Sequence, residues 1–572
     1  MPPVKGAVRR NQLVTTYGVG SIVALGDESF MVAGIDYWDI DAPNLHEPRL
    51  EKELRVRGFV SPPASGDDHR ADVPVVRFPR WQSCPECHRL APHKYFTSFD
   101  DNKCSFCDGG KPLIPSRFVI ACSRGHIEDF PYQAWVHQGH FDGDASHDLS
   151  LRTSGVTASL RDVEISCTCG EQQTLDKAFR VNALRHIKKC SGERPWLGAS
   201  ATEQCDETPR TLQRGGSNVW FAVPRSALSI PPWSEGAFKA LNEWWFVIKA
   251  IEPGALKGTL SAMGIADKAG YSVDDLVAAV LARKAAQDAG PEGETSIRRD
   301  EYAALERGRP EAAIPQDFVC VPAEGASAVR DWFDLVMAVP RLREVRALES
   351  FTRVFGPEPG DASRNAALFK ADPGWLPAME VAGEGVFLRL DPSRLSSWET
   401  RGDVVRRAAK IDANYRRHFH DIGKEPDKRI TPRFILLHTV AHLLINQWAL
   451  ECGYPAASLR ERIYADDEMA GVLVYTATSD SAGSLGGVVG LVSRKRLRPA
   501  IEEMLARAAW CSSDPLCGES EGSGVNSLNL AACHACCLLP ETSCEEMNVL
   551  LDRALVLGVP GTVGLGYFIG GD

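Results

Sequence analysis

The chain has 572 residues, of which 44% are hydrophobic and 24% are charged, a composition typical of globular proteins. Its formal net charge of −11 excludes a protein coated in positive charge, although a local basic groove is still compatible with it. The length alone predicts about three to five domains.

We expect an α+β protein of several domains, in four regions. Residues 1–80 alternate apolar runs with turns, which predicts a β-rich segment. Residues 81–210 hold two groups of cysteines and are expected to form a zinc-ribbon-like region. Residues 211–400 are expected to be mainly helical, and residues 401–572 to form a C-terminal, cysteine-containing α/β zinc domain.

Several segments carry the helix predictions. "GAFKALNEWWFVIKAI" and "SVDDLVAAVLARKAAQDAG" have apolar residues at helical spacing, and the second begins with a Ser cap. "VRDWFDLVMAVPRLREVRALESFTRVFGPEPGD" predicts a helix, a break at a proline, a second helix and a loop. Beyond residue 430, "FILLHTVAHLLINQWAL" predicts a buried helix and "GVLVYTATS" predicts a strand.

The start of the chain, "MPPVKGAVRRNQLVTTYGVG", has no apolar run of signal-peptide type. The most apolar long stretch, residues 434–450, is too short and too polar to span a bilayer. We therefore expect a cytoplasmic protein without a membrane partner, in which thiols stay reduced.

The first group of cysteines is Cys84, Cys87, Cys104 and Cys107. Two residues between cysteines let a tight turn direct both sulfurs at one point, and two such turns complete a tetrahedron around Zn²⁺. The spacing favours a zinc ribbon over an iron–sulfur cluster, whose familiar cysteine spacings differ.

The second group is less regular. Cys167 and Cys169 form a compact turn, to which Cys190 and Cys205 could add two further ligands. Cys122 with His126, in "CSRGH", is a competing pair.

The third group lies near the end of the chain. Cys533 and Cys536 form a turn, Cys544 follows, and the fourth ligand is expected from Cys511 or Cys517. The side chain of Cys537 is expected to point elsewhere and to pack. The three groups together predict about two or three structural zinc ions per chain.

Patterns typical of enzymes are weak or missing. The sequence lacks G-x-x-x-x-G-K-[ST] and H-E-x-x-H. His438 and His442 have the spacing of one helix face, but two histidines in an apolar helix are typical of core polar groups. We treat the G-x-S-x-G string at 518–522 as chance, because no apolar strand precedes it. No catalytic residue is therefore predicted.

Positive charge concentrates in two places. Between Arg401 and Arg433, ten Lys/Arg face five Asp/Glu, and a second run is "SRKRLRP". Clustered cations can follow a phosphate backbone, although such a run is also typical of a solvated helix face. The candidate nucleic-acid-binding residues are Arg406, Arg407, Lys410, Arg416, Arg417, Arg494, Lys495 and Arg496.

Three stretches resemble the DrmB family of the DISARM anti-phage defence system. "RRNQLVTTYGVGSIVALGDESFMVAGIDYW" resembles its start, and "ACSRGHIEDFPY" with "CSGERPWLG" its middle. "CSSDPLCGES" and "ACHACCLLPETSCEEMNVLLDRAL" resemble its closing cysteine-containing domain of unknown function, which is shared with some DNA-repair helicases.

The resemblance implies a non-catalytic accessory subunit that binds DNA and stimulates a helicase-like ATPase of the DrmA type, as a heterodimer. It places a metal on Cys533, Cys536 and Cys544 with Cys511 or Cys517, whereas Cys537 stands where an apolar residue is expected. The alternative is an independent zinc-dependent hydrolase or nuclease that uses His438 and His442.

Overall fold

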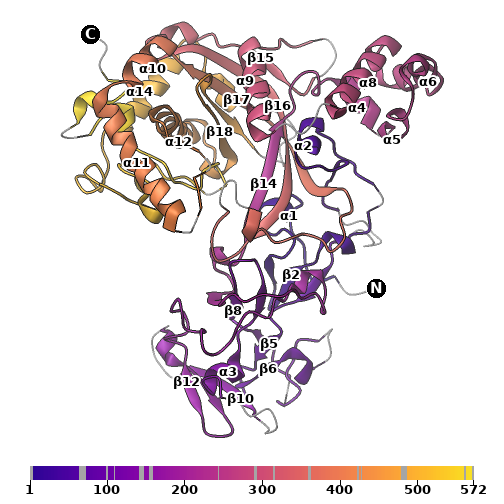
Figure 1. The fold of residues 1–572 in the computed structure, drawn as a ribbon, viewed down its shortest axis with the longest axis vertical. Coiled ribbons are helices and arrows are strands. Elements are labelled where there is room, and N and C mark those ends of the chain that lie inside the picture. Colours follow the sequence, from indigo (N-terminus) through magenta and orange to yellow (C-terminus); the bar gives the residue numbers. More distant parts are fainter. Residues whose placement is uncertain are drawn as a thin grey trace. The chain divides into compact units, whose positions relative to one another are not determined.

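The fold comes from a computed structural model (Figure 1). It describes residues 4–40, 42–63, 72–97, 101–108, 110–140, 147–153, 159–242, 244–288, 293–312, 316–357, 362–421, 424–426, 428–477, 486–540, 542–559 and 562–569. The ends of three expected segments, residues 289–290, 358–361 and 478–479, lie outside these ranges. Helices and sheets are mixed along the chain, which confirms the predicted α+β class.

The chain divides into two compact units. Unit 1 comprises residues 1–45, 56–225 and 346–379, and unit 2 comprises residues 46–55, 226–345 and 380–572. The division falls within three strands: β14 (Phe221–Leu228), β16 (Phe333–Thr352) and β17 (Leu376–Leu390).

Unit 1 is built from short strands in small sheets. Two sheets have three strands, in the orders β1-β2-β4 and β13-β8-β9, and one has six, in the order β12-β11-β10-β6-β5-β7. Their bounds are β1 (Ile22–Leu25), β2 (Glu28–Val32), β4 (Val75–Arg77), β5 (Trp81–Ser83), β6 (Arg89–Pro92), β7 (Ile114–Pro115), β8 (Phe118–Ala121), β9 (Ile127–Asp129), β10 (Leu149–Thr153), β11 (Val163–Cys167), β12 (Gln172–Thr174) and β13 (Arg210–Gln213). Short elements complete the unit: α1 (Gln12–Thr15), α3 (Tyr132–Val136) and β3 (Phe59–Val60), which pairs with the start of β17.

The first hairpin shows how local sequence fixes this architecture. Leu25 pairs with Glu28, so only Gly26 and Asp27 form the turn between β1 and β2. Gly26 has a φ of +62°, a conformation that a two-residue hairpin requires and that glycine adopts without strain. The β-strands expected in residues 1–80 are confirmed here.

A group of helices opens unit 2. Their bounds are α2 (Pro48–Glu53), α4 (Gly236–Asn242), α5 (Trp245–Ile248), α6 (Leu256–Ala262), α7 (Ile265–Ala269), α8 (Val273–Asp288) and α9 (Glu294–Arg307). The Ser272 hydroxyl accepts a 3.1 Å hydrogen bond from the Asp275 N–H, so the predicted cap at the start of α8 is confirmed. The helices expected at 236–251 and from residue 272 are present.

The helices expected between residues 329 and 354 are wrong, because most of this segment is the long strand β16. It pairs with β15 (Val319–Pro322) in a sheet of order β14-β16-β17-β19-β18. Its charged residues do not lie on an exposed face, because Arg343 and Glu344 are buried. Pro340 is tolerated because the register with β15 shifts there by one residue, as at a β-bulge.

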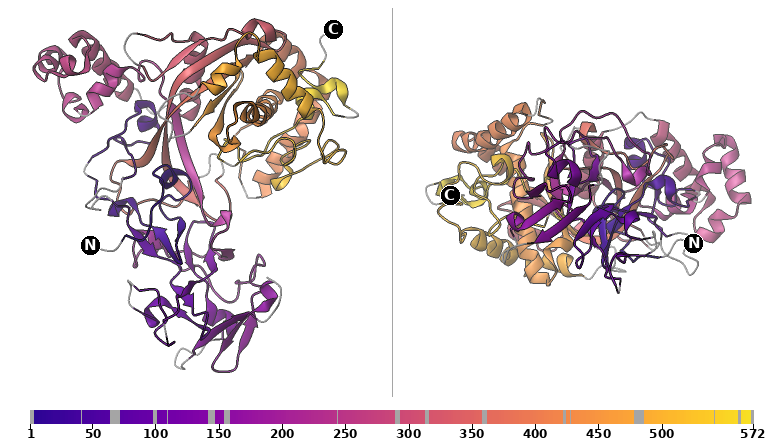
Figure 2. Two further views of the ribbon diagram at one scale, coloured as in Figure 1. Left: turned by 180° about the vertical axis from the view of Figure 1, so that it is seen from behind. Right: turned by 90° about the horizontal axis from the view of Figure 1, so that it is seen from below.

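The C-terminal part of unit 2 is organised around α12 (Pro432–Cys452), which is buried along most of its length. It packs against β18 (Leu459–Ala465) and β19 (Ala470–Thr476), and against α10 (Pro392–Glu399), α11 (Gly402–Asp421) and α14 (Leu497–Ala508) (Figures 1 and 2). α13 (Gly487–Leu491) and α15 (Ala554–Leu557) complete the set. The predicted buried helix and the strand after it are confirmed. A search of the described helices finds none with the length and apolarity needed to cross a membrane.

A buried ion pair joins α9 to β18. The Arg462 guanidinium donates to both carboxylate oxygens of Glu301 at 2.6 and 2.8 Å, and both side chains are almost fully buried. The Tyr464 hydroxyl donates to the same carboxylate at 3.2 Å. Removing one partner would leave a buried charge uncompensated.

We therefore predict that Arg462→Met lowers the free energy of unfolding by about 3–5 kcal/mol. Adding Glu301→Gln should recover part of the loss, which a double-mutant cycle from urea unfolding would measure. The exposed pair Arg299–Asp466 offers the control, because Arg299→Met should cost less than about 1 kcal/mol. Strictly additive losses for Arg462 and Glu301 would contradict the prediction.

Candidate metal centres and a basic helix

Among the described residues, five groups of side chains bring possible metal-ligand atoms within 4.8 Å of one another. We name them by their outer residues: the 84–107, 122–205 and 137–169 groups in unit 1, and the 511–536 and 438–544 groups in unit 2. Their members, in that order, are Cys84, Cys87, Cys104 and Cys107; Cys122, His126, Cys190 and Cys205; His137, His147, Cys167 and Cys169; Cys511, Cys517, Cys533 and Cys536; and His438, His442, Glu461 and Cys544.

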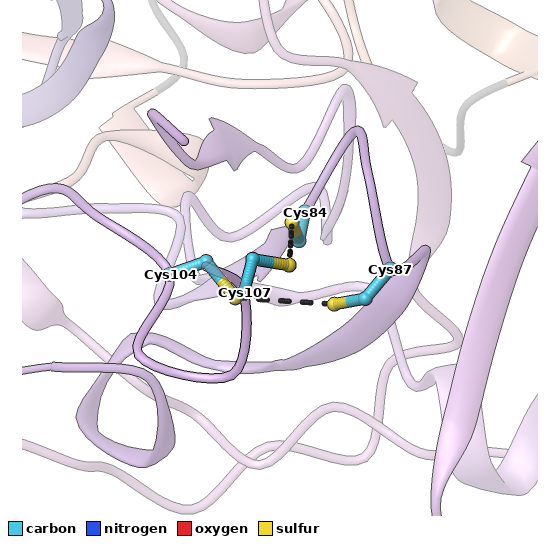
Figure 3. A group of neighbouring side chains, drawn as sticks. All are labelled: Cys84, Cys87, Cys104 and Cys107. Carbon is cyan, nitrogen blue, oxygen red and sulfur yellow. Dashed lines mark hydrogen bonds between the residues drawn. The ribbon is translucent and has the colours of Figure 1, made fainter. Parts of the chain in front are cut away.

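The 84–107 group brings together the four cysteines that sequence spacing had paired (Figure 3). Cys84 and Cys87 lie in the turn between β5 and β6, where the N–H of His88 donates to the Cys84 carbonyl at 3.0 Å. Cys104 and Cys107 lie in a second turn before β7. The Sγ atoms of Cys84 and Cys107 are 3.5 Å apart, and those of Cys87 and Cys104 are 3.9 Å apart.

These distances fit a tetrahedral metal site and exclude disulfides. Four sulfurs at about 2.3 Å from a zinc ion lie roughly 3.8 Å from one another. A disulfide requires an S–S distance of about 2.05 Å, and all 17 cysteines are free. The donor set of this group therefore fits Zn²⁺.

The 122–205 and 137–169 groups correct the second sequence grouping. Cys167, Cys169, Cys190 and Cys205 do not converge on one point: the first pair and the second pair belong to different groups. Sequence spacing did not reveal this division, because the ligands of each group are far apart in the sequence. Each group also includes histidine, which the spacing of cysteines alone does not reveal. "CSRGH" was the signal for Cys122 and His126, which join Cys190 and Cys205.

In the 122–205 group, His126 is oriented by a second contact. Its Nδ1 lies 3.3 Å from the Cys122 Sγ and 3.5 Å from the Cys190 Sγ, while its Nε2 lies 2.8 Å from a Glu203 carboxylate oxygen. A carboxylate on the far ring nitrogen is a common companion of metal-binding histidines. Gly192 permits the loop, because a Cβ there would lie 1.7 Å from the Glu203 carbonyl oxygen.

The 137–169 group joins α3 to the β10–β11 hairpin. His137 Nδ1 donates to the Gln133 carbonyl at 2.7 Å, which turns its Nε2 toward the Cys169 Sγ at 3.3 Å. His147 Nδ1 lies 3.2 Å from the Cys167 Sγ. Two thiols and two imidazoles form a further donor set that suits zinc.

The 511–536 group also differs from expectation. Both Cys511 and Cys517 face Cys533 and Cys536, with Sγ separations of 3.5 Å (Cys511–Cys533) and 3.8 Å (Cys517–Cys536). Cys544 is not part of this group, because its thiol lies beside His438, 3.3 Å from the imidazole Nε2. Sequence analysis took Cys544 as a ligand and left one place for Cys511 or Cys517, whereas the fold brings both of these cysteines into the group and leaves Cys544 out.

One thiol in each of three groups is strongly acidified. Hydrogen bonding with Cys190 lowers the pKa of Cys122 to about 4, with help from His126 and against the effect of burial. Hydrogen bonding with Cys517 lowers the pKa of Cys536 to about 2, and the Glu171 N–H lowers the pKa of Cys169 to about 6. These shifts favour the thiolate, which is the form that binds metals.

Cys537 packs as expected. Its side chain is fully buried within the main hydrophobic core of unit 2, and it is not one of the four members of the 511–536 group. Its neighbour Cys536 faces the other cysteines.

The predicted basic residues are divided by their surroundings. Arg407 points inward, where its guanidinium donates at 2.6 and 3.0 Å to the fully buried Asp552. It therefore stabilises the fold and is not free to bind a ligand, which corrects the expectation. The other seven predicted basic residues are exposed: Arg406, Lys410, Arg416, Arg417, Arg494, Lys495 and Arg496.

We predict that Cys536→Ala lowers the zinc content by about one ion per chain, whereas Cys537→Ala leaves it unchanged. The two thiols are adjacent in sequence, so the pair is a matched comparison of a thiol inside the donor set and one in the core. Elemental analysis of the purified chains provides the measurement. Equal losses of zinc from both variants would show that the ligand set is misassigned.

Two known protein families match separate parts of the chain. Residues 9–221 match a family described as a domain of unknown function, DUF8724, and residues 440–537 match the MrfA Zn-binding domain. The latter contains the whole 511–536 group, so the chain has a C-terminal zinc-binding domain, and zinc is confirmed as its metal. "DISARM protein DrmB" from Bacillus paralicheniformis is 31% identical over 566 residues, covering 93% of this chain and 97% of that protein. This similarity confirms the resemblance, and the chain belongs to the DrmB family of DISARM proteins.

Proposed function

We propose that the chain is a non-catalytic, DNA-binding accessory subunit that pairs with a helicase-like ATPase in anti-phage defence and stimulates it. The observation that carries the proposal is similarity to a DISARM protein along almost the whole chain. The sequence has no phosphate-binding G-x-x-x-x-G-K-[ST] of its own, so ATP hydrolysis is assigned to the partner.

Zinc has a structural role in this proposal. The residues that we assign as ligands are the members of the 84–107, 122–205, 137–169 and 511–536 groups. Each group offers four protein donors, and a site closed by four protein ligands leaves no position for a substrate or water. His438 and His442, on which the alternative zinc-dependent hydrolase depends, also lie in a group of four protein donors, which favours a metal-stabilised scaffold.

DNA contact is assigned to one face of α11. At 100° per residue, Arg406, Lys410 and Arg417 fall within roughly 40° of one another around the helix axis, and they extend over about 16 Å. The opposite face, including Val404, Ile411 and Tyr415, is buried. Arg406 and Lys410 also line a hollow of about 460 Å³ on the surface of unit 2.

The ion pairs on this face are of the weak, exposed kind. Lys410 contacts Glu521, whose side chain is 76% exposed, and Arg417 donates to the Asn414 side chain at 3.0 Å. Among the described residues, Arg406 has no carboxylate partner. Exposed ion pairs contribute little stability, so these cations can exchange their partners for phosphates at small cost.

We predict that Arg406→Ala, Lys410→Ala and Arg417→Ala together weaken DNA binding for unrelated sequences and reduce its salt slope by about three. Arg407 is left intact, because its loss would expose the buried Asp552 charge and confuse binding with folding. The charge-matched control is Lys257→Ala, Lys268→Ala and Arg299→Ala, which removes three exposed cations elsewhere in unit 2. Fluorescence anisotropy at several salt concentrations provides the measurement.

If the triple variant and the control bind DNA equally, α11 is a solvated face. The run Arg494, Lys495 and Arg496, changed together to Ala, then becomes the test of the second basic site.

The partner is tested separately. We predict that the purified chain hydrolyses no ATP, with or without DNA, and that it raises the DNA-dependent ATPase rate of the neighbouring helicase-like subunit. The helicase-like subunit alone is the control. An unchanged rate in a mixture that forms a stable complex would contradict the proposed stimulation.

A further inference from the structure

The 438–544 group differs in chemistry from the cysteine-rich groups. It combines His438 and His442, one turn apart on α12, with Glu461 from β18 and Cys544 from the segment that follows the 511–536 group. Both histidines and the glutamate are at most 1% exposed. Sequence analysis considered His438 and His442 as a pair, missed Glu461, and placed Cys544 elsewhere.

The atoms of the group converge on one point. His438 Nε2 lies 3.2 Å from one oxygen of Glu461 and 3.3 Å from the Cys544 Sγ, and His442 Nε2 lies 3.5 Å from the other Glu461 oxygen. Zinc bonds of about 2.0–2.3 Å in a tetrahedron separate nitrogen from oxygen by roughly 3.4 Å and nitrogen from sulfur by roughly 3.6 Å. The observed separations are close to these values.

A backbone contact fixes the tautomer of His442. Its Nδ1 lies 2.8 Å from the Cys537 carbonyl oxygen, which can only accept a hydrogen bond, so Nδ1 carries the proton. The Nε2 of the neutral ring then carries a lone pair and can only accept a hydrogen bond. It faces the Glu461 carboxylate, which is also an acceptor. Both atoms are buried, and neither has a hydrogen-bond partner among the described residues. Two buried acceptors aimed at each other require a cation or a proton between them.

Two backbone N–H groups point at the Cys544 sulfur. The backbone N–H groups of Glu546 and Asn548 donate to its Sγ at 3.3 and 3.2 Å. The N–H of Glu545 donates to Glu461 at 3.1 Å. Three backbone N–H groups within residues 545–548 thus donate to Glu461 and Cys544.

We propose that His438, His442, Glu461 and Cys544 bind a further structural zinc ion, separate from the ion of the 511–536 group. Two neutral imidazoles, one carboxylate and one thiolate balance the charge of Zn²⁺, so the occupied site is neutral within the protein interior. The thiolate disfavours Mg²⁺ and Ca²⁺, which prefer oxygen ligands, and two imidazoles with a thiolate suit zinc.

The site joins three segments that are distant in sequence. It links the centre of α12 to β18 and to the chain beyond Pro540, and the His442–Cys537 hydrogen bond connects it to the end of the 511–536 group. Zinc here therefore fixes the cysteine-rich segment onto the buried helix. Its role is structural rather than catalytic, because four protein ligands close the coordination sphere.

Zinc content of the full-length chain tests the site. Cys544→Ser and Glu461→Gln should each lose about one zinc ion per chain relative to the parent, and Cys544→Ser combined with Cys536→Ala should lose about two. Cys537→Ala is the matched control, a buried cysteine a few residues away whose thiol lies in the core. Folded Cys544→Ser and Glu461→Gln chains with the zinc content of the parent would overturn the proposal, because a protonated histidine–carboxylate pair needs no metal.

A measurement on the parent chain does not depend on the folding of variants. Anomalous diffraction collected at the zinc absorption edge should show a peak within bonding distance of His442 Nε2 and the Cys544 Sγ, in addition to those at the cysteine groups. Peaks at the cysteine groups with none at this position would overturn the proposal.

Discussion

Thiols held at tetrahedral spacing are the constraint on which unit 1 depends. The 84–107 group has only Phe96 and Leu113 beside two of its own cysteines in its buried cluster. The strands that flank its turns, β5, β6 and β7, are two to four residues long and bury little apolar surface beside it. Thiolates within 4.8 Å of one another also repel unless a cation lies between them. Metal binding compensates for the small apolar core and for the repulsion between thiolates, because the free energy of binding is gained only when the turns are folded.

Unit 2 is stabilised in a different way. Its main core surrounds α12 and extends from the long strands to α15, so apolar burial alone can support the fold. The proposed metals there fix the cysteine-rich end of the chain onto this core. On α11, structural and exposed cations are likewise separate. Arg407 stabilises the helix through the buried Asp552, whereas Arg406, Lys410 and Arg417 lie on the exposed face. A scaffold of this kind suits the proposed role of a subunit that binds DNA beside a partner enzyme.

Sequence alone predicted what local spacing encodes. The turns at Cys84–Cys87 and Cys104–Cys107, the cap at Ser272 and the buried helix at 434–450 each depend on residues a few positions apart. It did not predict sites assembled over long distances, such as His137 with Cys169 or Glu461 with Cys544, because a lone histidine or glutamate has no spacing to reveal its partners. The strand β16 was missed for a related reason: its charged residues are buried by partners that the sequence does not show.

Hydrogen exchange before and after removal of zinc by a chelator tests most directly whether metals hold unit 1 together. Once elemental analysis confirms that the zinc is gone, β5, β6, β8 and the β10–β11 hairpin should lose their protection. The helices α4 to α8 should keep theirs, because their own apolar cluster contains none of the metal-ligand groups. Unchanged protection of the unit 1 strands in the zinc-free chain would contradict a structural role for the metals.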